Sequence, residues 1–171
     1  LRGTKLSDEG LACLKGLPHL KKLQLGGNQI TNAGLVHVGQ LSKLEFLSVN
    51  DGGGSITSAG FVHLAGLKSF KTLSVGPWSE VSGEGLKELP TSLEELGLSY
   101  SSADDKALEQ IAKFTNLQKL YLHRCPITDA GITHLKAMTK LHYLALYETK
   151  VTDKALEQLR ELKNLKKLEL T

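Results

Sequence analysis

Apolar residues recur along this chain in a fixed order of spacings, and the clearest example spans residues 117–140. Leu117, Leu120 and Leu122 form the pattern Leu-x-x-Leu-x-Leu, in which the last two leucines alternate with polar residues. This alternation is typical of a half-buried strand. Beyond Pro126, apolar residues recur at every third position (Ile132, Leu135, Met138), which predicts a short helix with one apolar face.

The start of this helix is predicted from Ile127-Thr128-Asp129. Thr128 suits the N-cap, where its hydroxyl can accept a backbone N–H of the first turn, and Asp129 places negative charge at the positive end of the helix dipole. Ile127 and Ile132 have the spacing of a hydrophobic staple. One strand and one short helix cannot bury both of their apolar faces, so such units must stack.

The same unit recurs from end to end. Its first apolar residues are spaced by 24, 26, 23, 24, 24 and 24 residues and stand at Leu20, Leu44, Phe70, Leu93, Leu117, Leu141 and Leu165. We therefore predict one α/β solenoid domain over residues 1–171, with about seven repeats. A parallel sheet should line the concave side of an arc, and short helices should line the convex side.

The helix starts of successive repeats are similar to one another: LSDEGL (6–11), ITNAGL (30–35), ITSAGF (56–61), VSGEGL (81–86), ADDKAL (103–108), ITDAGI (127–132) and VTDKAL (151–156). With the leucine pattern, they resemble the leucine-rich-repeat superfamily, and in particular the repeats with a cysteine at the turn known from F-box proteins and many bacterial proteins. The resemblance implies a horseshoe-shaped solenoid and a role in recognition, including that of a substrate receptor in a ubiquitin ligase.

The two ends of the chain interrupt the repeat. Leu1 already occupies the last apolar position of a strand, and Thr171 directly follows the leucines of another strand. Terminal repeats of a solenoid usually carry polar caps, and none is visible in the sequence. We expect the chain to be a piece of a longer protein and a monomer in solution.

Composition narrows the classes of partner. The net charge of +3 comes from 21 basic and 18 acidic residues, which argues against a nucleic-acid groove with its concentrated basic stripe. No apolar run is long enough to span a membrane. Cys13 and Cys125 lie several repeats apart and are not expected to pair, which favours a reducing, intracellular compartment.

The sequence gives little support for a catalytic site or a metal site. His37, His63 and His134 occupy one helix position in three repeats, and a solvent-facing ladder explains them better than a zinc site does. The glycine-rich segment 50–55 lacks the Lys-Ser/Thr of a phosphate loop. Ser99 is the nearest non-phenolic hydroxyl to His123, which does not make a convincing nucleophile arrangement. We predict a non-enzymatic chain without a metal or cofactor.

The predicted concave face carries the candidate site. Equal positions of successive strands lie side by side, and all four tyrosines fall on outward positions of three adjacent strands, together with one histidine, one arginine and one glutamate. We call these residues the tyrosine patch: Tyr100, Tyr121, His123, Arg124, Tyr143, Tyr147 and Glu148. Small neighbours such as Gly97 and Ala145 are expected to leave the rings exposed.

Arg124 lies between Tyr100 and Glu148 in the predicted register, so it is expected to stack on one and pair with the other. Tyrosine and arginine often anchor protein interfaces. The alternative is that these tyrosines have no binding role and are present because tyrosine is common in β-strands.

Three further residues are candidates for contacts with a partner. Phe46 is an outward aromatic residue in the N-terminal half of the face, and Asp51 and Trp78 lie in two neighbouring insertions where strands leave the sheet. Trp78 equally suits a role in covering the irregular third repeat. The leading hypothesis is a non-catalytic module that binds an unidentified protein on its concave face and strand-exit edge. A substrate-recognition part of a larger enzyme complex and a structural spacer are the alternatives.

Overall fold

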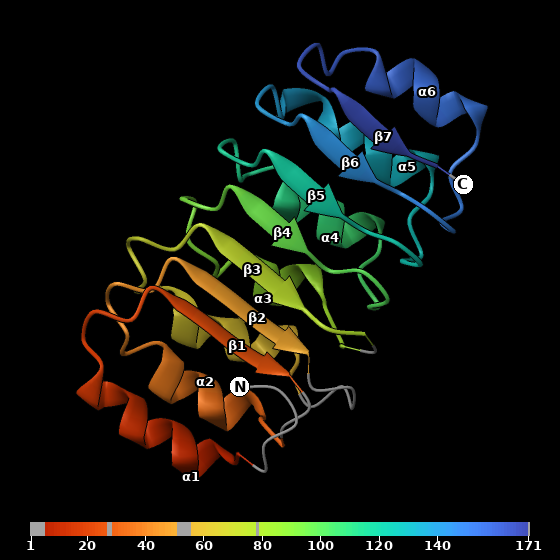
Figure 1. The fold of residues 1–171 in the computed structure, drawn as a ribbon. Coiled ribbons are helices and arrows are strands. Elements are labelled where there is room, and N and C mark those ends of the chain that lie inside the picture. The colour runs from red at the N-terminus through yellow and green to blue at the C-terminus, as the bar shows by residue number, and fades with distance from the viewer. Residues whose placement is uncertain (1–5, 27–28, 51–55, 78, 171) are drawn as a thin grey trace.

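Stacked strand-and-helix repeats build the whole protein in the computed structural model, which describes residues 6–26, 29–50, 56–77 and 79–170. Within these ranges, seven parallel strands form one open sheet in sequence order. They are β1 (Lys22–Gly26), β2 (Phe46–Asn50), β3 (Thr72–Val75), β4 (Glu95–Gly97), β5 (Lys119–Tyr121), β6 (Tyr143–Ala145) and β7 (Lys167–Glu169) (Figure 1). The predicted α/β solenoid and parallel sheet are confirmed.

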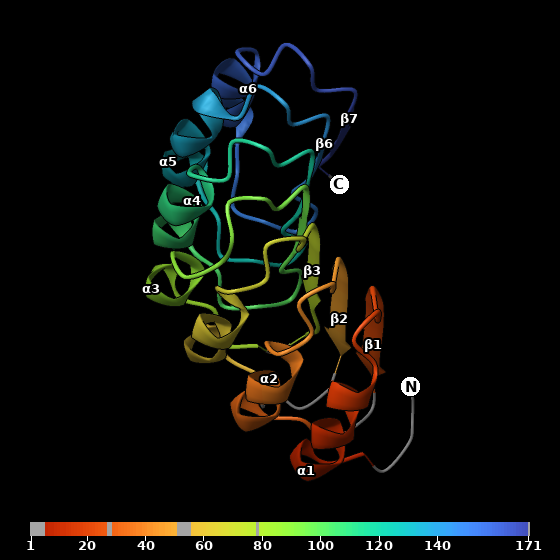
Figure 2. The ribbon, with the colours of Figure 1, turned by 90° about the vertical axis from the view of Figure 1, so that its left-hand side faces the viewer.

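Helical segments follow the strands and lie on the opposite side of the arc (Figure 2). The α-helices are α1 (Asp8–Leu11), α2 (Asn32–Val38), α3 (Gly83–Leu86), α4 (Asp105–Ile111), α5 (Asp129–Ile132) and α6 (Asp153–Leu159). The 3-10 segments are η1 (Ala12–Gly16), η2 (Ser58–Leu64) and η3 (Thr133–Ala137). The sheet side is concave and the helix side is convex, as the repeat pattern predicts.

The strand leucines form a continuous core. Leu47, Leu96, Leu120 and Leu144 are each fully buried, and the register pairs each strand leucine with that of the next strand. The leucine pattern also predicts a core position for Leu170, and this is wrong, because Leu170 is 40% exposed. It lies beyond the end of β7, at the edge of the sheet, where no described neighbour covers it.

Aspartates and threonines of the helix starts hold neighbouring repeats together. The Asp105 carboxylate accepts the backbone N–H of Thr128 at 2.8 Å and its hydroxyl at 2.6 Å. The Thr128 hydroxyl in turn caps α5 by accepting the N–H of Ala130, as predicted. The same ladder joins Asp8 to Thr31, Asn32 to Thr57 and Asp129 to Thr152. The repeated motif is thus a connector between repeats as well as a helix start.

Close approach at the ladder requires glycine. A Cβ added at Gly131 would overlap the Asp105 carboxylate and lie 2.9 Å from Leu108 Cδ1. At Gly85 it would overlap the backbone of Ser58. The glycines in the first helical turn, which recur in the sequence at this position of several repeats, therefore permit tight stacking of neighbouring repeats, as that recurrence predicts.

Candidate functional site

The tyrosine patch lies on β5, β6 and the chain immediately after β4, β5 and β6. The register places Gly97 beside Tyr121, and Tyr121 beside Ala145. Lys119, Tyr143 and Lys167 form the neighbouring row. The structure therefore brings together the seven residues that define the patch.

Tyr121 and Tyr143 form an aromatic pair. Their ring centroids are 4.8 Å apart with the planes tilted by 41°, and the Lys167 ammonium lies 5.0 Å from the Tyr143 ring centre. Both rings are half-buried, so the prediction that small neighbours leave them exposed is wrong for this pair. Gly97 and Ala145 are themselves buried, because the rings occupy the space that these small residues leave on the face.

Carboxylates flank the pair and change the chemistry of its phenols. Burial raises the pKa of Tyr121 above its ordinary value, with a further contribution from the Glu95 charge. Burial and a hydrogen bond to Glu169 raise the pKa of Tyr143. A hydrogen bond to Glu148 raises the pKa of Tyr147. These phenols are therefore neutral at physiological pH and act as hydrogen-bond donors to carboxylates.

The flanking residues Glu95, Lys119, Lys167 and Glu169 were not among the predicted site residues. Lys119 pairs with Glu95 at 3.3 Å and Lys167 with Glu169 at 2.8 Å. Their outward positions could be found from the repeat register, but their pairing with the tyrosines depends on side-chain conformations that no sequence spacing fixes.

The strand-exit edge carries the second half of the patch. The Arg124 guanidinium lies 5.2 Å from the Tyr100 ring centre and forms a two-pronged ion pair with Glu148, with Nη2 to Oε1 at 2.9 Å. This confirms the predicted stacking and pairing. The Arg124 hydrogen bonds lower the pKa of Glu148, so its carboxylate is charged at neutral pH. His123 packs edge-on against Tyr147 at 6.0 Å and lies 3.8 Å from Glu169.

Tyr100, Arg124 and Glu148 share an unusual backbone conformation. Their φ angles are 62°, 56° and 51°, and they are the only non-glycine residues with positive φ in the part of the chain that the structure describes. Each is the third residue of a tight turn, closed by hydrogen bonds from Ser101 to Leu98, from Cys125 to Leu122 and from Thr149 to Leu146. Glycine or asparagine normally occupies this turn position.

The next repeat holds two of these turns in place. The Tyr100 N–H donates to the His123 carbonyl at 2.6 Å, and the Arg124 N–H donates to the Tyr147 carbonyl at 2.9 Å. The left-handed conformation costs a residue with a side chain about 1–2 kcal/mol. Large side chains thus occupy turn positions at which the backbone geometry alone would favour glycine.

Other predicted residues lie apart from the patch. Phe46 is half-buried on β2, beside Lys22 and Thr72 and on the far side of β3 from β4. Asp51 and Trp78 lie outside the described residues, so their roles stay predictions.

Both cysteines are free, and two of the three helix histidines face solvent as expected. Cys125 is buried at its turn and Cys13 is exposed, and neither forms a disulfide. His63 and His134 are exposed on the helix side, whereas His37 is half-buried.

Metal-binding clusters and membrane-spanning helices are both absent from the described residues. Among them, no three or more His, Cys, Asp and Glu side chains are grouped closely enough to hold a metal ion. None of the helices in those ranges has the length and apolar character needed to cross a membrane.

Comparison with known proteins agrees with the architecture. The family profile described as Leucine Rich repeat matches residues 16–38 and 115–135. No curated protein matches the chain at a significant level of sequence similarity.

Solved structures with the same fold include two internalins from Listeria monocytogenes str. 4b F2365. The internalin inlF matches 99% of this chain with a TM-score of 0.67 and 17% identity, and the match covers 52% of inlF. The internalin C2 (inlC2) matches 99% with a TM-score of 0.68 and 24% identity, covering 78% of that chain. The chain therefore spans about half the length of inlF.

A third similar structure is that of a TLR13–ssRNA13 complex. It matches 92% of this chain with a TM-score of 0.67 and 26% identity, and the match covers 23% of the TLR13 chain. With the repeat register and the profile matches, these likenesses show that the chain has the leucine-rich-repeat fold. The cysteine-containing repeat subtype stays a prediction.

Proposed function

We propose that this protein is a non-catalytic protein-binding module whose tyrosine patch contacts the partner. The observation that carries the proposal is the row of three left-handed turn residues, Tyr100, Arg124 and Glu148. Backbone strain of this kind is often retained at functional sites. Here it supports large, interface-forming side chains at consecutive strand exits, next to the Tyr121–Tyr143 pair.

A protein partner suits this surface better than a nucleic acid does. The TLR13 structure contains single-stranded RNA, but the two lysines beside the tyrosine patch, Lys119 and Lys167, are each paired with a glutamate. Phosphate binding requires cations that are free to replace the counterions of the nucleic acid. Tyrosine rings and a charge-balanced rim are instead typical of protein interfaces.

The structural spacer is the second candidate, and one observation favours it. Arg124 is already satisfied by Glu148 and Tyr100, and Tyr121 by Tyr143, so the patch also stabilises contacts between its own repeats. A spacer needs no partner, whereas a binding module loses its partner when the patch is truncated. The role of substrate receptor in a larger enzyme complex would use the same patch.

The experiment that tests the proposal is a pull-down from a lysate of the source organism, with wild type and the variant Tyr121→Ala/Tyr143→Ala. A variant with two exposed convex residues truncated, Val36→Ala/Leu156→Ala, is the matched control. We expect a captured protein that the tyrosine variant loses, with an affinity lower by at least about 30-fold, or about 2 kcal/mol. Equal capture by all three proteins would refute the assignment of the patch, and no capture would favour the spacer.

A second variant tests the argument from strain. Tyr100→Gly removes the strain of the turn, which should raise the free energy of unfolding by about 1 kcal/mol. The loss of the contact with Arg124 offsets part of this gain. The substitution should also weaken partner binding. A more stable protein with unchanged affinity would contradict a functional reason for Tyr100 at this turn.

A further inference from the structure

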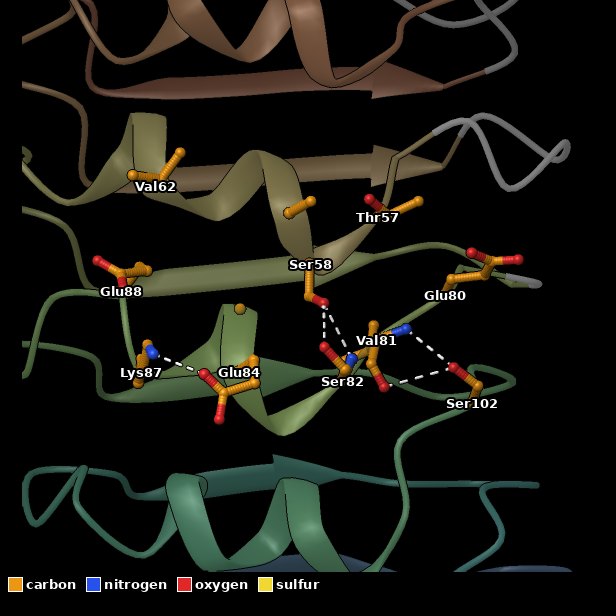
Figure 3. A pocket seen from close by; sticks show the side chains of 12 residues that line it. Thr57, Ser58, Val62, Glu80, Val81, Ser82, Glu84, Lys87, Glu88 and Ser102 are labelled. Atoms are coloured by element: carbon orange, nitrogen blue, oxygen red, sulfur yellow. Dashed lines mark hydrogen bonds and ion pairs between the residues drawn. The ribbon is translucent and has the colours of Figure 1, made fainter.

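The convex side is hollowed between η2 and α3 (Figure 3). We call this hollow the convex groove; its volume is about 540 Å³, and its lining includes Ala59, Val62, Glu80, Ser82 and Glu88. This volume lies within the range of about 300–1,000 Å³ typical of ligand pockets. The groove lies on the helix side, and at one end its residues Glu80 and Ser102 also line a second hollow with Tyr100 and Arg124 of the tyrosine patch. The role proposed below for the groove does not depend on the function proposed for that patch.

The irregular fourth helix start explains why the groove forms here. α3 has four residues (Gly83–Leu86), whereas the seven-residue α2 and α4 stand two and one repeats away. The hydrogen bonds from a threonine to a carboxylate, which join other neighbouring repeats at their helix starts, are also replaced here. Ser58 takes the aspartate position and reaches Ser82 through hydrogen bonds of 2.9 and 3.1 Å, and Gly83 in the next repeat has no side chain.

Small polar groups therefore line the floor of the groove. Ser58 and Ser82 lie there, and Ser102 accepts the Val81 N–H at 2.9 Å (Figure 3). Ser102 also donates to the Val81 carbonyl at 3.3 Å, and Ser58 is buried. Because a hydroxyl group can accept two hydrogen bonds, the exposed Ser82 and Ser102 keep acceptor capacity for the N–H groups of an incoming peptide backbone. Beside them, Ala59 is exposed and Val62 is 49% exposed, which gives one wall an apolar surface.

The rim of the groove is acidic. Glu88 lies at one end, beside Lys87 and Glu84, and Glu80 lies at the other end, beside Ser102 (Figure 3). Lys87 is paired with Glu84, and this hydrogen bond lowers the pKa of Glu84. Glu80 and Glu88 form no side-chain ion pair with any other described residue. Lys87, whose charge interacts with both Glu84 and Glu88, is the one basic residue in the lining, so the groove carries a net negative charge.

We propose that the convex groove binds an extended peptide segment of a partner protein, with basic residues on both sides of a small apolar side chain. The basic residues pair with Glu80 and Glu88, and the apolar side chain packs against Ala59 and Val62. The N–H groups of the peptide backbone donate hydrogen bonds to the Ser82 and Ser102 hydroxyls. Charge complementarity favours this basic peptide over an acidic or a purely apolar peptide.

The probe is an array of short peptides in which lysine or arginine residues flank alanine, valine or leucine. The same peptides with glutamate in place of the basic residues form the reference set. The strongest binder is then labelled with fluorescein and titrated by fluorescence polarisation against wild type and variants. Glu80→Lys/Glu88→Lys reverses the rim, and Ala59→Gln fills the groove without a change of charge.

Glu157→Lys/Glu161→Lys is the matched control, because it makes the same change of net charge at exposed positions in and just after α6. We expect the rim variant to raise Kd by about tenfold or more, the filled variant to lose binding, and the control to change Kd by less than about twofold. Binding should also weaken with added salt. The variant Tyr121→Ala/Tyr143→Ala should bind the peptide as wild type does.

Three results would overturn the proposal. One is that no basic peptide binds wild type more strongly than its glutamate counterpart. Another is equal weakening in the rim and control variants, which would show attraction by net charge alone. The third is loss of peptide binding in the tyrosine variant, which would place the peptide on the concave face. Circular dichroism of each variant excludes misfolding as the cause.

Discussion

Gly131 offers the sharpest test of how the repeats are held together. It lies in the first turn of α5, where an added Cβ would overlap Asp105 Oδ1 and lie 2.9 Å from Leu108 Cδ1. The Asp105 carboxylate is held by the N–H and the hydroxyl of Thr128. A side chain at position 131 must therefore displace this carboxylate and weaken both hydrogen bonds between the two repeats.

The magnitude follows from these contacts. A hydrogen bond to a charged group contributes about 1.5–3 kcal/mol, and we take the lower value for each bond because the site is only partly buried. Overpacking adds about 1–3 kcal/mol, while the gain in helix propensity from glycine to alanine returns about 1 kcal/mol. Gly131→Ala should therefore destabilise the protein by about 3 kcal/mol, and Gly131→Val by more.

Thermal unfolding followed by circular dichroism measures this effect. For a domain of 171 residues, about 3 kcal/mol lowers Tm by about 10 °C. Gly66→Ala is the control, because nothing lies within 4 Å of a Cβ at that position. In an Asp105→Ala background the Gly131→Ala substitution should cost about 1 kcal/mol or less, since the displaced carboxylate and its two hydrogen bonds are already absent. A Tm of Gly131→Val within a degree of wild type would show that the close approach does not stabilise the stack.

Three further predictions concern titratable groups. Cys13 is exposed, whereas burial both shields Cys125 and raises its pKa, so a thiol reagent should modify one cysteine in the native protein and both in denaturant; rapid modification of both would contradict the buried turn. Ultraviolet absorbance should show that Tyr121, Tyr143 and Tyr147 ionise above the ordinary tyrosine pKa of 10.0, and ionisation of these three near that value would argue against their carboxylate contacts. Hydrogen bonds from Thr152 lower the pKa of Asp129 below 3.8, so its contribution to stability should be complete above that pH and lost as the pH falls through the lowered value. Asp129→Asn should make acid urea-unfolding curves less dependent on pH, and an unchanged slope would refute this role.

The repeat spacing alone determines most of the fold. Once Leu120 and Leu122 define an inward strand face, identical spacing in every repeat fixes the parallel register, the concave sheet and the burial of the leucines. The tyrosines and Arg124 follow from the same register, so their gathering on one face could be predicted. The position of Leu170 could not, because its burial depends on the neighbour that the next strand would supply.

The remaining features depend on the tertiary structure, because they involve contacts between groups of different repeats, which the repeat spacing does not specify. The half-burial of Tyr121 and Tyr143 arises from their contact across two strands. The left-handed turn at Tyr100 is held by a carbonyl of the next repeat, against the local preference for glycine. The convex groove lies where the short α3 meets the 3-10 segment η2 of the preceding repeat. Sequence periodicity specifies what each repeat shares, and packing decides what happens where a repeat departs from it.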